Sequence, residues 1–301
     1  MKVSASNNRM RRIKEIVAPY LFILPAFVLV VAFMGWPLAF SFWLSLTNYN
    51  LVYPEKATFV GLGNFIRLLQ DPAVLNAAKV TGIYAAIGII GRMLIGLFLA
   101  ILIESKIKGK WLFRSAVFMP LVIASTIIAL IWNFMLAADI GIINVTLRRL
   151  GLGFLERSWT GDPNLALYTI SAVSIWAGVG VPTIYFIAGL KGIPEELYDS
   201  AKIDGAGWLQ QQIHVTIPNL KEWFIIVGIM QAISSIKAFD LPFVMTGGGP
   251  MNRTTTFYIL IYRVAFDYNK LGYAAAIAYF MLIIILILAY VNTRIFRAER
   301  R

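Results

Sequence analysis

Few side chains in this 301-residue sequence can do chemistry on a solute, and the clearest group lies in an apolar stretch. Gln231, Ser234 and Ser235 are spaced i, i+3 and i+4, which places them on one face of a helix. Their amide and hydroxyl groups can exchange hydrogen bonds with the polar groups of a solute. The same residue types also join membrane helices to each other. The pattern therefore predicts a polar stripe that either lines a path for a solute or holds helices together.

Further candidates lie in the same stretch and in two others. Lys237 and Asp240 stand three residues apart, so they can pair with each other or contact a solute. Trp176 can stack on the apolar face of a sugar ring, with Gly178 leaving room beside it, although tryptophan also anchors helices at the membrane interface. A charge at the centre of a span costs about 2.5–3.5 kcal/mol. We therefore expect Arg92 to pair with a neighbouring helix or subunit rather than to bind a ligand.

The inventory of residue types excludes several kinds of site. The chain has no cysteine and a single histidine, His214, so thiol nucleophiles, iron–sulfur clusters and cysteine- or histidine-based metal cages are not expected. It also lacks a Gly-x-x-x-x-Gly-Lys-[Ser/Thr] phosphate loop. We therefore expect no catalytic residue, no metal and no cofactor bound by this chain, and any ATP must be bound by a partner.

The composition indicates which elements must position these residues. Hydrophobic residues make up 59% of the chain and charged residues 14%, whereas soluble domains have about 45–50% and about 25%. A spanning helix needs about 20 predominantly apolar residues. Six stretches qualify, so we predict an all-α polytopic membrane protein with six transmembrane helices. The predicted spans are residues 17–46, 78–103, 113–137, 165–190, 222–245 and 271–293.

The distribution of basic residues predicts the orientation. The net charge is +12, and 16 of the 27 lysines and arginines lie on the side of the two termini, against 9 on the other side. The positive-inside rule therefore places both termini and the 191–221 loop in the cytoplasm. The basic residues gather at span ends, where they meet anionic lipid headgroups, so we expect no nucleic-acid partner. The chain then divides into an N-terminal tail (1–16), a six-span domain (17–295) and a C-terminal tail (296–301).

The cytoplasmic loop 191–221 carries the most informative local pattern, which begins with helix signals. Pro194 suits the first turn of a helix. Glu195 and Glu196 follow where the positive end of the helix dipole favours carboxylates. Apolar residues then recur three or four positions apart, as in an amphipathic helix. We therefore predict a short helix over 195–203.

The same loop then carries stop signals and a second helical piece. Gly205 and Gly207 suit the end of a helix because glycine adopts left-handed backbone geometry without strain. A second amphipathic piece is predicted over 208–215, ending near Pro218. Two short helices tied to two spans can fit a groove on another protein. The alternative is an ordinary cytoplasmic connection.

The residues of this loop also carry a resemblance to a known family. The EAA motif of ABC-transporter permeases is Glu-Ala-Ala, three residues, Gly, nine residues, then Ile-x-Leu-Pro. The positions that match it are Asp199, Ser200 and Ala201 for the triplet, Gly205 for the glycine, and Val215, Ile217 and Pro218 for the end. The departures are Asp for Glu, Ser for Ala, Val for Ile and Ile for Leu. The shorter side chain of Asp199 weakens any salt bridge that the family makes from that position.

Two longer strings resemble the carbohydrate-uptake subgroup of these permeases, similar to maltose and glycerol-phosphate permeases. They are Ile193-Pro-Glu-Glu-Leu with Ala201-Lys-Ile-Asp-Gly-Ala-Gly207, and Thr246-Gly-Gly-Gly-Pro250 with Thr254-Thr-Thr256. Together with the span count and loop lengths, the resemblance covers nearly the whole chain. The residues that it assigns to coupling with an ATPase are Glu195, Glu196, Asp199, Ser200, Ala201, Asp204, Gly205, Ala206, Gly207 and Pro218.

The resemblance implies a division of labour in the bacterial cell membrane. The chain would form half of a translocation pathway, most often as a heterodimer with a second, similar permease. The EAA loop would be a coupling helix that docks on one of two cytosolic ATPase subunits, which use ATP and Mg. An extracytoplasmic binding protein would deliver a carbohydrate to the outer loops. The residues expected along the substrate pathway are Gln231, Ser234, Ser235, Lys237, Asp240, Trp176 and Gly178.

The alternative function is that of an ion-coupled secondary transporter. Such a carrier needs an intramembrane carboxylate as its ion site, and the predicted spans offer only Asp240 and, at a membrane edge, Glu104. The resemblance favours the ATP-driven importer.

Overall fold

The computed structural model describes residues 20–105 and 109–299, and the regular elements in these ranges are helices. Three helices are long and apolar enough to cross a membrane by themselves: Tyr20–Ser45, Pro72–Glu104 and Leu271–Tyr290. Three pairs of shorter helices pass the same test together but are bent at a break. The described part of the chain thus contains up to six spans, which confirms the predicted all-α, six-span fold.

Helices and single helical turns also make up most of the connections. In chain order the elements are η1 (Val31–Gly35), α2 (Trp36–Ser45), η2 (Pro54–Lys56), α3 (Gly63–Gln70), α4 (Pro72–Glu104), α5 (Lys110–Val122), α6 (Ser125–Met135), α7 (Ile142–Arg149), η3 (Gly153–Leu155), α8 (Ala166–Gly178), α9 (Gly180–Lys191), α10 (Glu195–Ile203), α11 (Trp208–Gln211), η4 (Gln212–Thr216), α12 (Ile217–Asn219), α13 (Lys221–Ile236), α14 (Asp240–Thr246), α15 (Phe257–Tyr262), η5 (Arg263–Asp267) and α16 (Leu271–Glu299).

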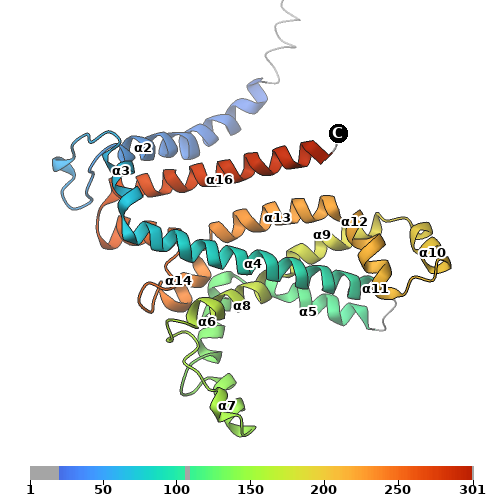
Figure 1. Cartoon of the computed structure of the whole chain (residues 1–301). Helices are drawn as coiled ribbons and strands as arrows, with labels where there is room; N and C mark the ends of the chain where they lie inside the picture. Colours follow the sequence, from blue (N-terminus) through green and yellow to red (C-terminus); the bar gives the residue numbers. More distant parts are fainter. Residues whose placement is uncertain (1–19, 106–108, 300–301) are drawn as a thin grey trace, which may run out of the picture.

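The long helix α4 lies at the centre of the bundle, packed against α8, α9 and α13 (Figure 1). Its start is fixed by Asp71, whose carboxylate accepts a hydrogen bond from Ala73 N at 2.9 Å. Glycine lets its neighbours approach closely, since a Cβ on Gly96 would lie 2.8 Å from Pro182 Cβ and 3.3 Å from Thr183 N. Within a membrane the hydrophobic effect does not hold helices together, because lipid tails are as apolar as the side chains. Small residues let the helices approach closely and gain van der Waals contact instead.

Two of the predicted spans are interrupted. The stretch 113–137 is divided into α5 and α6, which meet at 105°, with Ile123 and Ala124 extended between them. The stretch 222–245 is helical only to Ile236, where α13 ends, and α14 begins again at Asp240. Helices α5 and α6 still qualify together as one bent span, as predicted. For the second stretch the pair that qualifies is Trp208–Asn219 with Lys221–Ile236, bent by 69°, so this candidate span begins and ends earlier than predicted.

A third predicted span, 165–190, is bent by 46° between α8 and α9. The bend lies at Val179, with Gly178 and Gly180 on either side of it. Pro182 follows one turn later and has no N–H to donate to the carbonyl of Gly178, which weakens the helix at this point.

The short helices of the 191–221 loop lie beyond the ends of the spans. Figure 1 shows α10 and α11 at one end of the molecule, past α4, α9 and α13. Helix α10 covers Glu195–Ile203, which are the bounds predicted from its capping residues. The start of the first span at Tyr20 and the C-terminal part of α16 point toward this same end (Figure 1).

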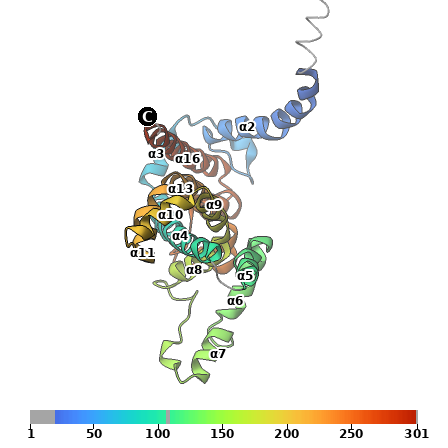
Figure 2. The same ribbon diagram turned by 90° about the vertical axis from the view of Figure 1, so that its right-hand side faces the viewer.

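The first span packs against the last one and stands apart from the rest of the bundle (Figures 1 and 2). Ser41 Oγ and Tyr279 OH lie 3.2 Å apart, and the Tyr279 hydroxyl also donates to Leu38 O at 2.5 Å. The Phe42 ring meets Tyr279 edge-on at 5.2 Å between centroids. Most of the apolar surface of this first helix is therefore left for lipid or for a partner.

We expect Gly96→Ala to lower the thermal unfolding temperature of the detergent-solubilised protein. The added methyl group would press on Pro182 and on the Thr183 backbone, and overpacking of this kind costs about 1–3 kcal/mol. Gly82→Ala is the matched control, because a Cβ on that glycine of α4 meets nothing within 4 Å. The control should unfold at the same or a higher temperature, and equal melting of the two variants would contradict the packing described.

Candidate functional site

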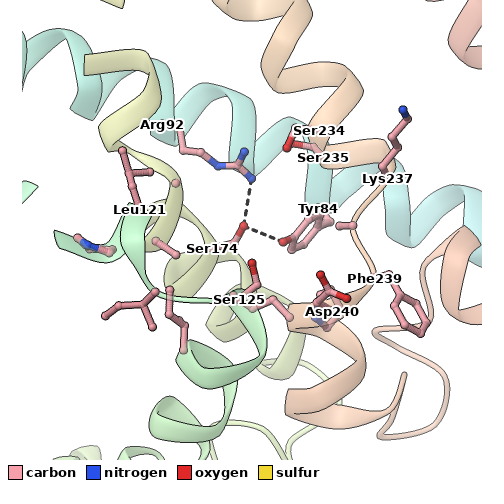
Figure 3. Close-up of a pocket in the computed structure, with 18 residues that line it drawn as sticks. Tyr84, Arg92, Leu121, Ser125, Ser174, Ser234, Ser235, Lys237, Phe239 and Asp240 are labelled. Atoms are coloured by element: carbon pink, nitrogen blue, oxygen red, sulfur yellow. Dashed lines mark hydrogen bonds between the residues drawn. The ribbon is translucent and has the colours of Figure 1, made fainter. Parts of the chain in front are cut away.

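A cavity of about 430 Å³ opens where the two interrupted spans meet α4 and α8 (Figure 3). Its walls come from α4, α5, α6, α8, α13 and α14 and from the breaks between them. Its polar lining residues are Tyr84, Arg92, Ser125, Ser174, Ser234, Ser235, Lys237 and Asp240. Apolar walls with a few convergent polar groups are typical of small-molecule sites.

Arg92 ties three helices together at the wall of this cavity. Its Nη1 donates to Gln231 Oε1 at 2.6 Å, and its Nη2 donates to Ser174 Oγ at 3.0 Å. The Tyr84 hydroxyl donates to the same serine oxygen at 2.7 Å (Figure 3). All four side chains are buried. Arg92 therefore pairs with neighbouring helices, as expected, and the bonds connect α4, α8 and α13.

The predicted polar stripe divides between its two interpretations. Gln231 is only 4% exposed and its amide oxygen is held by Arg92, so it joins α13 to α4. Ser234 and Ser235 both line the cavity. Ser234 is exposed, whereas Ser235 is buried and its Oγ has no hydrogen-bond partner among the described residues.

Lys237 and Asp240 line the cavity as two separate charges. Because α13 ends at Ile236, the two residues are not on one helix. Figure 3 shows Lys237 pointing away from Asp240, and the ion pairs found in residues 20–105 and 109–299 do not include them. Of the two options that the sequence left open, the mutual pair is wrong.

The two candidates from the fourth span have different positions. Trp176 lies outside the cavity, and its ring packs edge-on against Trp132 with centroids 5.6 Å apart. Gly178 lines the cavity, and a Cβ there would lie 3.1 Å from Arg92 Cδ. Glycine at this position thus makes room for the arginine side chain.

Three polar lining residues were missed from the sequence: Tyr84, Ser125 and Ser174. Each is a polar side chain in an apolar span, which is the signal that drew attention to Arg92. The sequence does not single out Ser174 as the partner of this guanidinium, because the two residues are 82 positions apart. In the described part of the chain, no group of three or more His, Asp or Glu side chains is placed to hold a metal ion.

The second candidate site is the surface of the 191–221 loop. Tyr198 OH and Thr216 Oγ1, 2.9 Å apart, tie α10 to η4. Lys202 Nζ donates to Asp199 Oδ1 at 2.9 Å, and this carboxylate raises the pKa of Lys202. Gly205 follows α10 with φ at +80°, the left-handed geometry predicted for a glycine at a helix end, whereas Gly207 is extended with φ at −65° and precedes α11. The loop is therefore a fixed unit with a local ion pair at its first motif residue.

The residues assigned to coupling gather on this surface. Those that line a groove of about 450 Å³ between α10 and the following turns are Ser200, Ala201, Asp204, Gly205 and Ala206. Those outside the groove are Glu195, Glu196 and Asp199 on exposed α10, Gly207 before α11, and Pro218 in α12. Ile203 and Trp208 are 87% and 60% exposed. Large apolar side chains exposed beyond the spans indicate a surface that binds another protein.

Comparison with known proteins identifies the family of the chain. Residues 92–301 match the family described as binding-protein-dependent transport system inner membrane component. The chain belongs to this family. The match extends from Arg92 in α4 through the cavity-lining part of α13 and the whole 191–221 loop.

Individual members of this binding-protein-dependent transport family resemble the chain over nearly its whole length. A protein of Bacillus subtilis named "Probable ABC transporter permease protein YurN" is 37% identical over 94% of this chain and 97% of its own. The trehalose/maltose transport system permease protein MalF of Thermococcus litoralis is 31% identical over 97% of this chain and 99% of its own.

The fold is also that of a solved transporter subunit. A chain in the crystal structure of a bacterial alginate ABC transporter, in complex with its alginate pentasaccharide-bound periplasmic protein, superposes with a TM-score of 0.79. The two chains are 20% identical, and the likeness covers 96% of this chain and 97% of the other. The likeness thus extends over nearly the whole fold.

We expect Gln231→Leu to destabilise the protein by about 1–3 kcal/mol, because it leaves the buried Nη1 of Arg92 without its acceptor. Gln231→Glu keeps an acceptor and adds an opposite charge, so it should retain most of the stability. Ser234→Ala, on the exposed side of the same helix, is the control. Denaturant unfolding measures all three variants, and a leucine variant as stable as the alanine control would show that the Arg92–Gln231 bond contributes nothing.

Proposed function

We propose that this chain is the permease subunit of an ATP-driven importer and forms half of the translocation pathway for a carbohydrate. The observation that carries the proposal is α10, an exposed helix with EAA spacing that lies beyond the spans (Figure 1). Membership of the binding-protein-dependent transport family supports the importer. The relative named for trehalose/maltose transport supports a sugar or oligosaccharide as its substrate.

The coupling step follows from the way the loop joins the spans. Helix α9 runs from the cavity wall near Gly178 to α10, and α13 runs back from the loop to Gln231 and Ser235. A cytosolic ATPase subunit that binds α10, through its groove and through Ile203 and Trp208, would pull on both helices. ATP and Mg would be bound by the two ATPase subunits, since this chain has no phosphate loop.

The remaining partners complete the pathway. Ser234, Lys237 and Asp240 line the cavity and are exposed in the single chain, which favours a second, similar permease across from them. An extracytoplasmic binding protein would meet the outer loops, including Gly247–Pro250, where Arg263 Nη2 donates to Gly247 O at 2.6 Å. Both termini and α10 then lie in the cytoplasm of a bacterial cell.

The test is to purify the chain from its native membrane in mild detergent and identify the proteins that accompany it. Recovery with an ATPase that carries a phosphate loop and with a second permease supports the proposal, and sugar-stimulated ATP hydrolysis is then measured on the complex. Recovery as a single chain that transports without ATP would overturn it.

We expect Gly205→Val to abolish sugar-stimulated ATP hydrolysis while the complex still assembles in the membrane. A β-branched residue is strained at φ +80°, by about 1–2 kcal/mol, and relief of this strain changes the angle between α10 and α11. Gly205→Asn should be milder, because asparagine tolerates left-handed geometry.

The matched control for this variant is Gly109→Val. Gly109 has φ at +84° and lies at the start of α5, and neither glycine has a neighbour within 4 Å of an added Cβ. The control therefore carries the same backbone strain at a site outside the coupling surface. Equal losses of ATPase stimulation in the two valine variants would contradict a specific coupling role for Gly205.

A further inference from the structure

Among the residues that the structure describes, none forms an ion pair with Arg92. The residue lies inside the membrane-spanning helix α4 and is only 5% exposed. In residues 20–105 and 109–299 the ion pairs are made by Arg114, Arg148 and Lys202, and none reaches Arg92. A buried cation at membrane depth is expensive unless an anion pairs with it. An anion from outside the chain would supply the missing counter-charge.

The guanidinium also has unused hydrogen-bond donors. Arginine has five N–H groups, and Arg92 donates to Gln231 through Nη1 and to Ser174 through Nη2. Its Nε has no partner among the described residues. The Nε and Nη2 groups of arginine form a fork that matches the two oxygens of a carboxylate, sulfate or phosphate.

A second unsatisfied group lies near the same guanidinium. Ser235 Oγ is in a side chain that is 1% exposed, and it too has no partner in the described structure. A Cβ placed on Gly88 would lie 2.8 Å from Arg92 Nη2 and 3.5 Å from Ser235 Oγ, so the Nη2 edge of the guanidinium and the serine hydroxyl border the same glycine. Arg92 and Ser235 both line the cavity. Two buried polar groups without partners at one wall indicate a ligand group that binds between them.

The other charged residues of the cavity fit a ligand that has hydroxyl groups as well as an anionic group. Lys237 and Asp240 are the remaining charged lining residues, so the cavity carries a net charge of +1. Asp240 lies apart from Arg92, near Phe239 (Figure 3). A carboxylate there can accept hydrogen bonds from sugar hydroxyls, and an aromatic ring can stack on a sugar ring. A neutral sugar would satisfy this end and leave Arg92 unpaired.

We propose that the cavity recognises a carbohydrate that carries an acidic group, and that Arg92 binds this group together with the Ser235 hydroxyl. The acidic group is a carboxylate, a sulfate or sulfonate, or a phosphate ester, all of which present anionic oxygens to the fork. This inference rests on the proposed function, since it specifies the class of carbohydrate. Because Arg92 is buried within the chain itself, an anion reaches it through the cavity and not from the surface of a second permease.

The test uses the complete complex, with its ATPase and second permease, in nanodiscs of neutral phosphatidylcholine without binding protein. The probes are uronic-acid disaccharides and the carboxyl-reduced neutral forms of the same disaccharides. We expect the acidic form to bind about 10–100-fold more tightly, the range typical of hydrogen bonds to a charged group, as measured by calorimetry or by the rise in unfolding temperature. Equal or weaker binding of every acidic form would overturn the proposal.

Three variants locate the effect at this wall of the cavity. Arg92→Gln should abolish the preference for the acidic form, and Arg92→Lys should restore part of it. Ser235→Ala should weaken binding of the acidic form without lowering the unfolding temperature of the free complex, because its hydroxyl has no partner to lose. Ser171→Ala is the control, a buried serine of α8 that bonds Leu167 O and lies outside the cavity.

The possible results are distinct. If Arg92→Gln does not assemble, the Ser235→Ala and Ser171→Ala pair decides the proposal, and equal binding by these two would overturn it. The wild-type complex is also tested with anionic phosphatidylglycerol in the absence of sugar. If this lipid stabilises the complex and the effect depends on Arg92, the ligand is a lipid headgroup and the proposal is overturned. Tight binding of neutral sugars alone refutes the acidic class and leaves the importer intact. If no ATPase is recovered with the purified chain, the proposal that the chain belongs to an ATP-driven importer is itself refuted.

Discussion

Inside a bilayer each backbone N–H and C=O must find its partner within the protein, and this constraint organises the whole molecule. Irregular backbone at membrane depth is tolerated where it borders a water-filled space. Ile123, at the break between α5 and α6, and Lys237–Phe239, between α13 and α14, all lie on the wall of the cavity. The breaks in the two spans and the cavity therefore depend on each other. The breaks help to form the cavity, and the cavity gives the irregular backbone a polar surrounding.

The two helices that lead from this cavity to the 191–221 loop are also joined at their far ends. Leu220 is fully buried where α13 begins, and Gly189 near the end of α9 leaves no room for a Cβ between Leu220 and Trp223. Tyr198 of α10 is bonded to Thr216 on the same side. These contacts tie α9, α10 and α13 to one another at the loop end of the bundle.

The parts of the structure that the sequence predicted are those determined by local chemistry. The six apolar stretches follow from hydropathy, and the bounds of α10 follow from Pro194, the first-turn glutamates and Gly205. The Arg92 cluster depends on partners 82 and 139 residues away, so no local pattern contains it. The same limit applies to the Lys237–Asp240 pair, which a continuous helix would have allowed and which the break after Ile236 prevents.

The contact between the first and last spans has a consequence for biosynthesis. Ser41 meets Tyr279 across 238 residues of chain, so the first helix leaves the ribosome long before its packing partner exists. At about 5–20 residues per second the interval is roughly 10–50 s. During that time the helix lacks this packing partner, and its predominantly apolar surface is compatible with lipid. Closure of α16 onto Leu38 and Ser41 therefore follows the synthesis of the spans between them.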